Sequence, residues 1–231
     1  MATNAYGQPV GTDLTGWSPP RIPEPRDIEG TRVTVTPLIW ADHGAALFRE
    51  LAPAPASIWT YMSYGPFNGI SQFEEALRVK DVNPDIIPYA LVVDGQPLGF
   101  ACYLRINPEQ GVIEVGSIVL SPRLQKTTAA TEALYLMIRN AFDIGYRRVE
   151  WKCDDLNAPS RAAAERLGFT YEGTFRQAVH YKGRNRDTAW YAIIDRDWPV
   201  LDEAFRRWLE PGNFDASGTQ KSTLREIRER T

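Results

Sequence analysis

The chain has 231 residues, enough for one large domain or two small ones. Hydrophobic residues make up 43% and charged residues 24%, so the chain can build a core and wholesale disorder is excluded. A net charge of -3 lacks the basic surplus typical of proteins that bind the nucleic-acid backbone. No apolar run approaches the roughly 18 residues of a membrane span, and the N-terminus has no signal-peptide pattern. These features favour a cytoplasmic protein with no nucleic-acid or membrane partner.

The cysteines and the N-terminal prolines limit the kinds of structure and site that the chain can form. Cys102 and Cys153 are too few for a disulfide scaffold and lack the spacing of a metal site. Prolines recur in residues 1–30, which predicts an extended segment lying over the body of the protein. Alternating apolar residues then predict a strand over 31–38, and Asp42 is expected to cap the helix that follows.

The remaining elements give a mixed α/β order. Asp94-Gly95 is a strong hairpin turn signal between two apolar runs. The predicted elements are helices over 45–51 and 71–80, strands over 89–93, 98–106 and 112–120, a helix over 128–142, a strand over 149–153, a helix over 157–167, strands over 169–181 and 186–194, and a helix over 200–209. This order indicates one layered domain over 31–210, followed by a polar tail over 211–231.

The loop from Ser121 to Thr127 joins a predicted strand to a predicted helix and is a candidate anion site. A helix N-terminus presents free backbone N–H groups and a positive dipole end, which suit a pyrophosphate. Arg123 and Lys126 add charge, while Thr127 and Thr128 add hydroxyl donors. The alternative is a plain connection with solvated basic residues, because the loop lacks the glycines typical of close phosphate approach.

Other polar residues each allow a catalytic and a structural interpretation. Glu114 interrupts an apolar strand and serves as a general base if it faces a cleft, or as the polar side of the strand if it faces solvent. Helix capping explains Asn157, whereas Ser160 can donate a hydrogen bond to a departing anion. His180 and Cys153 fit ordinary strand positions as well as catalytic ones.

Three pieces of sequence between Gly111 and Pro199 carry a family resemblance. They read EVGSIVLSP, ATEALYLMIRNAFDIGYRRVEWKCDDLNAPSRAAAERLGFTYEG and GRNRDTAWYAIIDRDWP. In this order they resemble the GCN5-related N-acetyltransferases (GNAT), specifically the RimJ/RimL-like branch. The resemblance implies an α/β (α+β mixed) fold with a central, mostly antiparallel twisted sheet of about six to seven strands flanked by helices.

The resemblance also implies acetyl-CoA as cosubstrate, with no metal. The loop pattern Q/R-x-x-G-x-G/A of the family is matched by Gln125, Thr128 and Ala130, with Thr128 at the first glycine. Asn157 matches an asparagine that contacts the pantetheine arm, and Ser160 matches a serine proposed to protonate the CoA thiolate. The full set of implied cofactor-binding residues is Ile118, Leu120, Gln125, Lys126, Thr127, Thr128, Ala129, Ala130, Asn157 and Ser160.

The identity of the general base is left between two residues. Some family members use a strand glutamate at the position of Glu114, whereas the ribosomal-protein branch uses a later glutamate where this chain has Val179. Glu114 and His180, the residue after Val179, are therefore the base candidates. Ser160→Ala and Glu114→Gln are each expected to lower kcat.

The expected activity is transfer of an acetyl group to a primary amine of a small molecule or a peptide N-terminus by direct attack. Trp59, Tyr61 and Glu114 are expected to line the acceptor site, although the aromatic segment around Trp59 fits a core equally well. Sheet edges in this family often pair, which favours a homodimer. Two alternatives stay open: an acyl-CoA-binding protein without transferase activity, favoured by Thr128 and Val179, and a transferase for longer or acidic acyl groups.

Overall fold

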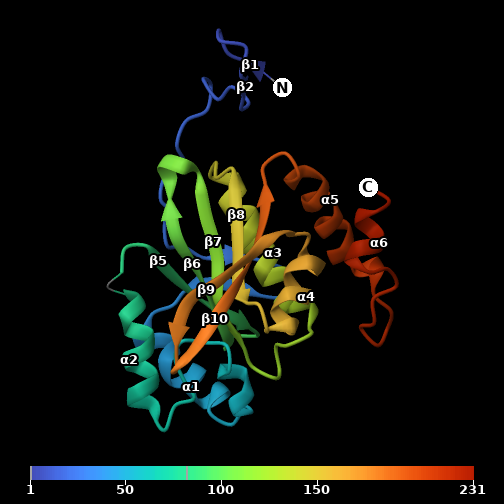
Figure 1. Ribbon diagram of the computed structural model, residues 1–231. Coiled ribbons are helices and arrows are strands. Elements are labelled where there is room, and N and C mark those ends of the chain that lie inside the picture. The colour runs from blue at the N-terminus through green and yellow to red at the C-terminus, as the bar shows by residue number, and fades with distance from the viewer. Residues whose placement is uncertain (1, 82) are drawn as a thin grey trace.

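The protein was analysed as a computed structural model that describes residues 2–81 and 83–231. Its centre is an eight-stranded sheet in the order β3-β4-β5-β6-β7-β8-β10-β9 (Figure 1). The strands are β1 (Ala2–Thr3), β2 (Pro9–Val10), β3 (Ile28–Glu29), β4 (Thr34–Pro37), β5 (Ile86–Val93), β6 (Gln96–Asn107), β7 (Val112–Leu120), β8 (Arg148–Asp154), β9 (Thr170–Tyr181) and β10 (Arg184–Ile194). Only β7 and β8 pair in parallel, which confirms the mostly antiparallel sheet. The eighth strand, β3, was not predicted because it is a short edge piece within the proline-rich segment.

Helices cover both faces of the sheet. They are α1 (Ala45–Leu51), α2 (Ile70–Asp81), α3 (Thr128–Asp143), α4 (Ala158–Leu167), α5 (Trp198–Leu209) and α6 (Leu224–Arg228). Alternation along β5 divides the core, because Tyr89 and Leu91 lie in the cluster with α3, whereas Ala90 lies in the cluster with α1 and α2. The sheet thus has a separate apolar layer on each face, and the helices expected to flank it are confirmed.

The parallel pair β7 and β8 separates after a short contact. Their pairing covers Val112↔Arg148, Ile113↔Val149 and Glu114↔Glu150, and ends there. A bulge against β6 at Ser117, which has φ 52°, bends β7 away from β8 at this point. Beyond Glu114 on β7 and Glu150 on β8, the edges of the two strands that face each other therefore have no strand partner in the described chain. We call this opening between β7 and β8 the splay.

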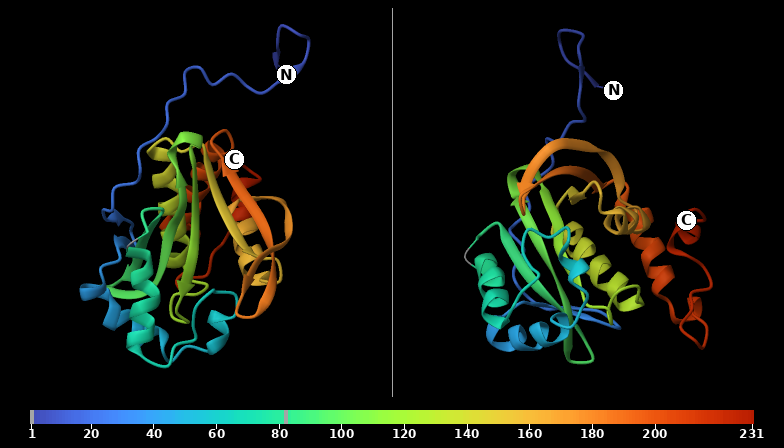
Figure 2. Two further views of the ribbon diagram at one scale, coloured as in Figure 1. Left: turned by 60° about the vertical axis from the view of Figure 1, so that its left-hand side comes forward. Right: turned by 60° about the horizontal axis from the view of Figure 1, so that its bottom comes forward.

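The two ends of the chain differ from the prediction. The segment before β3 runs along the body from Trp17 onward, where Trp17 stacks on Arg147, but the β1-β2 hairpin projects away from the body (Figure 2). Residues 211–231 are not simply a polar tail, because α6 buries Leu224 and Ile227 in the main core. Thr223 and Glu226 form a capping box that starts α6.

One predicted helix start is wrong. Asp42 does not cap a helix; it lies inside a π-helical turn over Trp40–Gly44 that leads into α1. The backbone N–H of Ile39 donates to Nδ1 of His43 at 3.1 Å and begins this turn instead. Within the described residues, no helix is both long and apolar enough for a bilayer, and no three His, Cys, Asp or Glu side chains gather as metal ligands.

Candidate active site

The inner edge of β7 presents backbone groups to the splay. Ser121 donates its N–H to the Leu98 carbonyl at 3.0 Å, so Ser121 belongs to a pair hydrogen-bonded across β6. Because bonded and unbonded positions alternate in an antiparallel ladder, the N–H and C=O of Leu120 and Ile118 point away from β6. The carbonyl of Leu120 accepts from Nε2 of Gln125 at 2.9 Å on that side. The edge formed by Ile118 and Leu120 can therefore pair with an extended amide-containing ligand.

From Gln125 to the first turn of α3, three backbone donors have no intramolecular partner in the described chain. Thr127 caps α3 by accepting from Ala130 N–H at 3.1 Å, so Ala130 is not part of the expected phosphate cradle. Gln125 N–H is likewise engaged, with Ser121 O at 2.9 Å. The N–H groups that remain belong to Lys126, Thr128 and Ala129, and Lys126 holds a left-handed conformation with φ 61°. This cluster of N–H groups at a helix N-terminus suits an anion.

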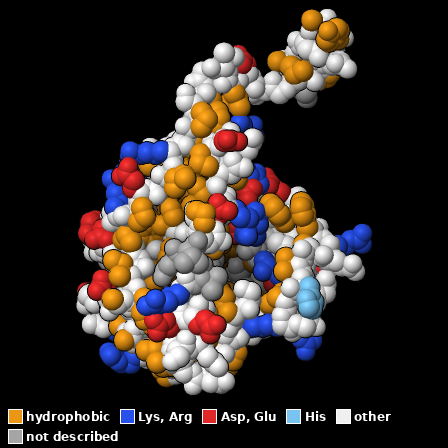
Figure 3. All heavy atoms as spheres, turned by 90° about the vertical axis from the view of Figure 1, so that its left-hand side faces the viewer, with side chains coloured by type: hydrophobic (Ala, Val, Ile, Leu, Met, Phe, Trp, Pro, Cys, Tyr) orange, Lys and Arg blue, Asp and Glu red, His pale blue; other side chains and the backbone are white. Residues whose placement is uncertain are grey.

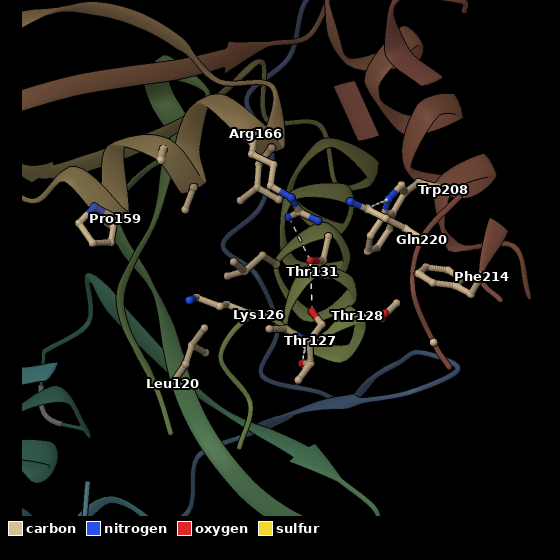
Figure 4. A pocket seen from close by; sticks show the side chains of 16 residues that line it. Leu120, Lys126, Thr127, Thr128, Thr131, Pro159, Arg166, Trp208, Phe214 and Gln220 are labelled. Carbon is tan, nitrogen blue, oxygen red and sulfur yellow. Dashed lines mark hydrogen bonds between the residues drawn. The ribbon is translucent and has the colours of Figure 1, made fainter. Parts of the chain in front are cut away.

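A cavity of about 500 Å³ lies beside this loop, between α3, α4 and the chain after α5 (Figure 4). It extends from Leu120, at the end of β7, to Trp208 and Phe214. The implied cofactor residues that line it are Leu120, Lys126, Thr127, Thr128 and Ala130. Ile118, Gln125, Ala129, Asn157 and Ser160 lie outside its lining. The lining residues that sequence reasoning missed include Arg166, Trp208, Phe214 and Gln220.

Asn157 and Ser160 lie at the start of α4. The side chain of Asn157 caps this helix by accepting from Ser160 N–H at 3.2 Å, as the capping interpretation predicted. Trp151 donates its indole N–H to Ser160 Oγ at 3.0 Å, which leaves the hydroxyl proton of Ser160 to be donated elsewhere. Cys153 is buried next to Ser160, and burial raises the pKa of its thiol. That shift disfavours Cys153 as a nucleophile.

Glu114 lies on the opposite face of the sheet, inside a network of charges. Arg105 donates two hydrogen bonds to the carboxylate, one from Nε to Oε2 at 2.7 Å and one from Nη2 to Oε1. Lys152 Nζ lies 3.2 Å from Glu114 Oε2 and 2.6 Å from Glu150 Oε2, and 3.8 Å above the Trp190 ring. Two cations on this buried carboxylate occupy the oxygens that a base would use. The role of Glu114 as base stays a prediction that this pairing does not favour.

The network continues along β8 to Arg148. Arg148 contacts Glu150 at 2.8 Å and also Glu172 of β9. Burial opposes the ionisation of Glu150, but hydrogen bonds from Lys152 and Arg148 outweigh it and hold the pKa of Glu150 below its ordinary value. Acidic and basic side chains are also interspersed over the side of the molecule that carries α2 and β5 (Figure 3).

Asp154, at the end of β8, is a buried carboxylate of a different kind. It accepts from Tyr181 Oη at 2.8 Å and from Leu156 N–H at 2.9 Å, and no cation forms an ion pair with it among the residues that the structure describes. Burial and the hydrogen bond to Asp154 raise the pKa of Tyr181 to about 12, so Tyr181 keeps its proton and donates it. Asp154 pairs in register with Thr188, whose buried hydroxyl has no partner in the described chain.

His180 lies beside this cluster in sequence but points away from it. Tyr181 reaches Asp154, and alternation along β9 places the neighbouring His180 on the other face of the strand. His180 is exposed there, opposite Asn185 in the hairpin register. The role of His180 as base therefore stays a prediction without support from this geometry.

The aromatic segment expected at the acceptor site divides into core and surface residues. Trp59 is only 4% exposed and packs against Phe67 and Tyr64, with ring centroids 5.1 and 6.1 Å away. Tyr61 instead reaches across to the loop after β8 and donates to the Leu156 carbonyl at 3.0 Å. Lys182, near the tip of the β9-β10 hairpin, donates to the Trp59 carbonyl at 2.8 Å. Tyr61 and Lys182 thus connect the segment to the β8 side of the splay, and Tyr64 connects it to β7 through a hydrogen bond with Ser117 Oγ at 2.6 Å.

Trp59→Ala is expected to lower the free energy of unfolding by about 3 to 5 kcal/mol, because it removes a buried aromatic ring and leaves a cavity. Urea unfolding measures the loss. Tyr61→Phe, which removes only a surface hydroxyl, should stay within about 1 kcal/mol of the parent. A Trp59→Ala protein of parental stability and altered acceptor KM would restore the pocket interpretation of Trp59.

Lys152→Met is expected to lower the free energy of unfolding by about 3 kcal/mol at pH 7, since it leaves two buried carboxylates short of a cation. Glu150 has a folded pKa below its unfolded pKa, so its contribution is present above the unfolded pKa and is lost as pH falls through the folded pKa. Removing Lys152 raises that folded pKa. The difference between variant and parent in the free energy of unfolding should therefore shrink below about pH 4.5, as urea unfolding at several pH values would show.

Arg196→Met removes an exposed pair with Asp197 and is the control, with an expected change within about 0.5 kcal/mol. A Lys152→Met loss that is the same at every pH would contradict the charge explanation.

Comparisons with known proteins agree with this architecture. The sequence profile of the acetyltransferase (GNAT) family matches residues 48–169. The crystal structure of a GCN5-related N-acetyltransferase from Brucella melitensis is 41% identical, covers 94% of this chain and all of that one (100%), and superposes with a TM-score of 0.90. A structure described as "probable acetyltransferases (GNAT family)" from Chromobacterium violaceum ATCC 12472 is 40% identical over 83% of this chain and 97% of that one, with a TM-score of 0.80.

A curated relative gives a more distant match. The "Putative ribosomal N-acetyltransferase YdaF" of Bacillus subtilis (strain 168) is 26% identical over 113 residues. The match covers 48% of this chain and 61% of that protein, so it spans less than two thirds of the relative's length. The chain belongs to the acetyltransferase (GNAT) family, as the resemblance predicted.

Proposed function

We propose that the protein is an N-acetyltransferase that moves an acetyl group from acetyl-CoA to a primary amine of a small molecule or a peptide N-terminus. The observation that carries the proposal is the continuity of the splay with the cavity at the α3 N-terminus, joined at Leu120. A long ligand with an extended amide arm and a charged end fits that combination of an unpaired strand edge and an anion site.

The residues present fit acetyl-CoA. The backbone edge at Ile118 and Leu120 would pair with the pantetheine amides, and the N–H groups of Lys126, Thr128 and Ala129 would bind the pyrophosphate. Thr128 stands where the family pattern has glycine, but its backbone N–H is free in the described chain, so the replacement leaves that donor available. Acetyl-CoA supplies the activated acetyl group and a thiol leaving group.

In our proposal, the two proton transfers take place on opposite faces of β8. Alternation places Asp154 towards the face with Tyr181, whereas Cys153 and the neighbouring Ser160 lie on the α4 face. In our proposal Asp154 takes a proton from the amine as the C–N bond forms. The Leu120 N–H stabilises the oxyanion, and Ser160 protonates the sulfur as the C–S bond breaks. Asp154 thus replaces Glu114 and His180 as the preferred base candidate.

Isothermal titration with acetyl-CoA and free CoA tests the proposal first. We expect saturable binding near micromolar strength, about -8 kcal/mol. Release of CoA thiol in the presence of a panel of primary amines and N-terminal peptides then tests transfer. Binding without transfer to any amine would favour an acyl-CoA-binding protein that is not an enzyme, and absence of binding would overturn the proposal altogether.

A further inference from the structure

The last two strands add an arginine to the face of the sheet that carries Asp154. Tyr181 reaches Asp154 from β9, and the guanidinium carbon of Arg186, on β10, lies 5.9 Å from the centroid of the Tyr181 ring. Asp154 pairs in register with Thr188 of β10, two residues after Arg186. Because side chains alternate along a strand, Arg186 is the side chain next to Thr188 on this face. Arg186 therefore lies beside the carboxylate that we propose as the base.

Arg186 is a cation that no other side chain of the described residues neutralises. Its Nε is buried without a hydrogen-bond partner, and no carboxylate forms an ion pair with its guanidinium in that part of the chain. The side chain as a whole is only partly buried, so its terminal nitrogens stay open to a ligand. A partly desolvated guanidinium without a carboxylate of its own favours one from a ligand, which it can bind with two parallel N–H groups.

The tip of the β9-β10 hairpin adds positive charge around Arg186. Lys182 and Arg184 lie on either side of the turn at Gly183, and neither forms an ion pair within residues 2–81 and 83–231. Lys182 donates instead to the Trp59 carbonyl at 2.8 Å, where Figure 1 shows the tip beside the chain between α1 and α2. The potential at this end of the sheet therefore attracts an anionic group and repels a polyamine.

β9 adds an exposed apolar surface next to Arg186. Phe175 is 57% exposed and Val179 is 42% exposed, and Val179 pairs in register with Arg186. The ring of Phe175 packs against Trp190, with centroids 4.7 Å apart, and Nζ of Lys152 lies over the Trp190 ring on the same face of the sheet. Apolar side chains beside an unpaired cation fit a ligand that has an apolar group next to an anionic one.

We propose that the acceptor is a free α-amino acid with an apolar side chain. Its amine lies at Asp154, its carboxylate binds Arg186, and its side chain packs on Phe175 and Val179. The inference rests on the proposed function, because it names the amine that the same site acetylates. It adds a specificity: the site distinguishes a free amino acid from a peptide N-terminus, whose first carboxyl group is an uncharged amide.

The carboxylate of the amino acid is bound but does not react. The neutral amine forms the C–N bond with the acetyl carbon and gives one proton to Asp154. The C–S bond breaks, and the sulfur takes a proton from the acid on the α4 face of β8. The products are an N-acetylamino acid and CoA.

Rates of CoA release with L-leucine and with L-leucinamide test the assignment in the full-length chain. The two acceptors share an amine and a side chain, but leucinamide has a neutral amide in place of the carboxylate. Arg186→Gln is expected to lower kcat/KM for leucine by about 10-fold or more, the usual contribution of a charge-assisted hydrogen bond, and to leave leucinamide within about twofold. Each acceptor is compared between parent and variant, so the different basicities of the two amines cancel. Arg186→Lys restores the charge and should recover part of the loss.

Phe175→Ala tests the apolar surface. It should lower kcat/KM for leucine by about 10-fold and that for glycine, which has no side chain, by no more than about twofold. Arg176→Gln is the matched control, because Arg176 is an exposed arginine that follows Phe175 and lies on the other face of β9. It should leave the kcat/KM of all three acceptors unchanged.

Leucinamide distinguishes loss of contact from loss of fold, because a misfolded Arg186→Gln protein would lose activity with both acceptors. Equal losses for leucine and leucinamide in Arg186→Gln would overturn the assignment of Arg186. A parent protein that acetylates peptide N-termini or polyamines but not leucine would overturn the amino-acid acceptor and leave the proposed function standing. A parent protein that acetylates no amine would overturn both.

Discussion

Asp154→Asn is expected to lower kcat by about 10²- to 10⁴-fold while leaving the Kd of acetyl-CoA within about twofold. The amide oxygen can accept from Tyr181 or from the Leu156 N–H but not from both, and the amide cannot take a proton from the amine. The measurement is the rate of CoA release between about pH 5 and 9, with the best acceptor from the amine panel.

Glu114→Gln is the direct competitor in the same assay. Its carboxylate holds Arg105 and Lys152, so the substitution should reduce stability and affect kcat less than Asp154→Asn does. Tyr181→Phe removes one donor to Asp154 and should lower kcat without abolishing turnover. Full activity in Asp154→Asn, together with a strongly lowered kcat in Glu114→Gln, would return the role of base to Glu114.

The sequence predicted the elements better than the contacts between them. The apolar face of α3 and the hairpin at Asp94-Gly95 were predictable because period and turn chemistry are local. The ion pair of Glu114 with Arg105 was not predictable, because it depends on a bulge in β6. In that bulge Arg105 has φ 46°, which turns its side chain to Glu114. Lys152 lies on β8, and no local sequence pattern encodes the parallel register of β8 with β7.

The ordered structure of the chain after α5 was missed for a different reason. A polar composition suggested a tail, although Thr223 and Glu226 at capping-box spacing, followed by buried Leu224 and Ile227, signal a helix docked on the core. That signal locates α6 but not the cavity wall, since the contact of Phe214 with the cavity depends on how the chain returns to α3. Arg166 was within the family resemblance, yet only its enclosure without an acidic partner in the described chain distinguishes it from a solvated helix residue.

Ser160→Ala is the other substitution with a large expected effect on rate. We expect kcat to fall by about 10²- to 10⁴-fold with the KM of acetyl-CoA little changed, because the hydroxyl contributes only when charge develops on sulfur. Trp151 fixes the hydroxyl by donating to Ser160 Oγ, so the proton of Ser160 points away from Trp151, on the side of Cys153. Trp151→Phe keeps an aromatic ring but removes the donor, and should lower kcat by about 10-fold as the hydroxyl loses its orientation.

Cys153→Ala identifies which neighbour supplies the proton. The Cys153 thiol lies beside Ser160 and has a raised pKa, so it is protonated at neutral pH and is the competing acid. If Ser160 is the acid, Cys153→Ala retains near-parental kcat, and the solvent deuterium effect on kcat disappears only in Ser160→Ala. The reverse pattern, a Ser160→Ala protein with full turnover and an impaired Cys153→Ala protein, would assign the acid to the strand cysteine. Either result places the acid on the α4 face of β8, opposite Asp154, because both side chains lie on that face. In the proposed mechanism the amine would then enter from the Tyr181 side, and the thiol would leave from the α4 side.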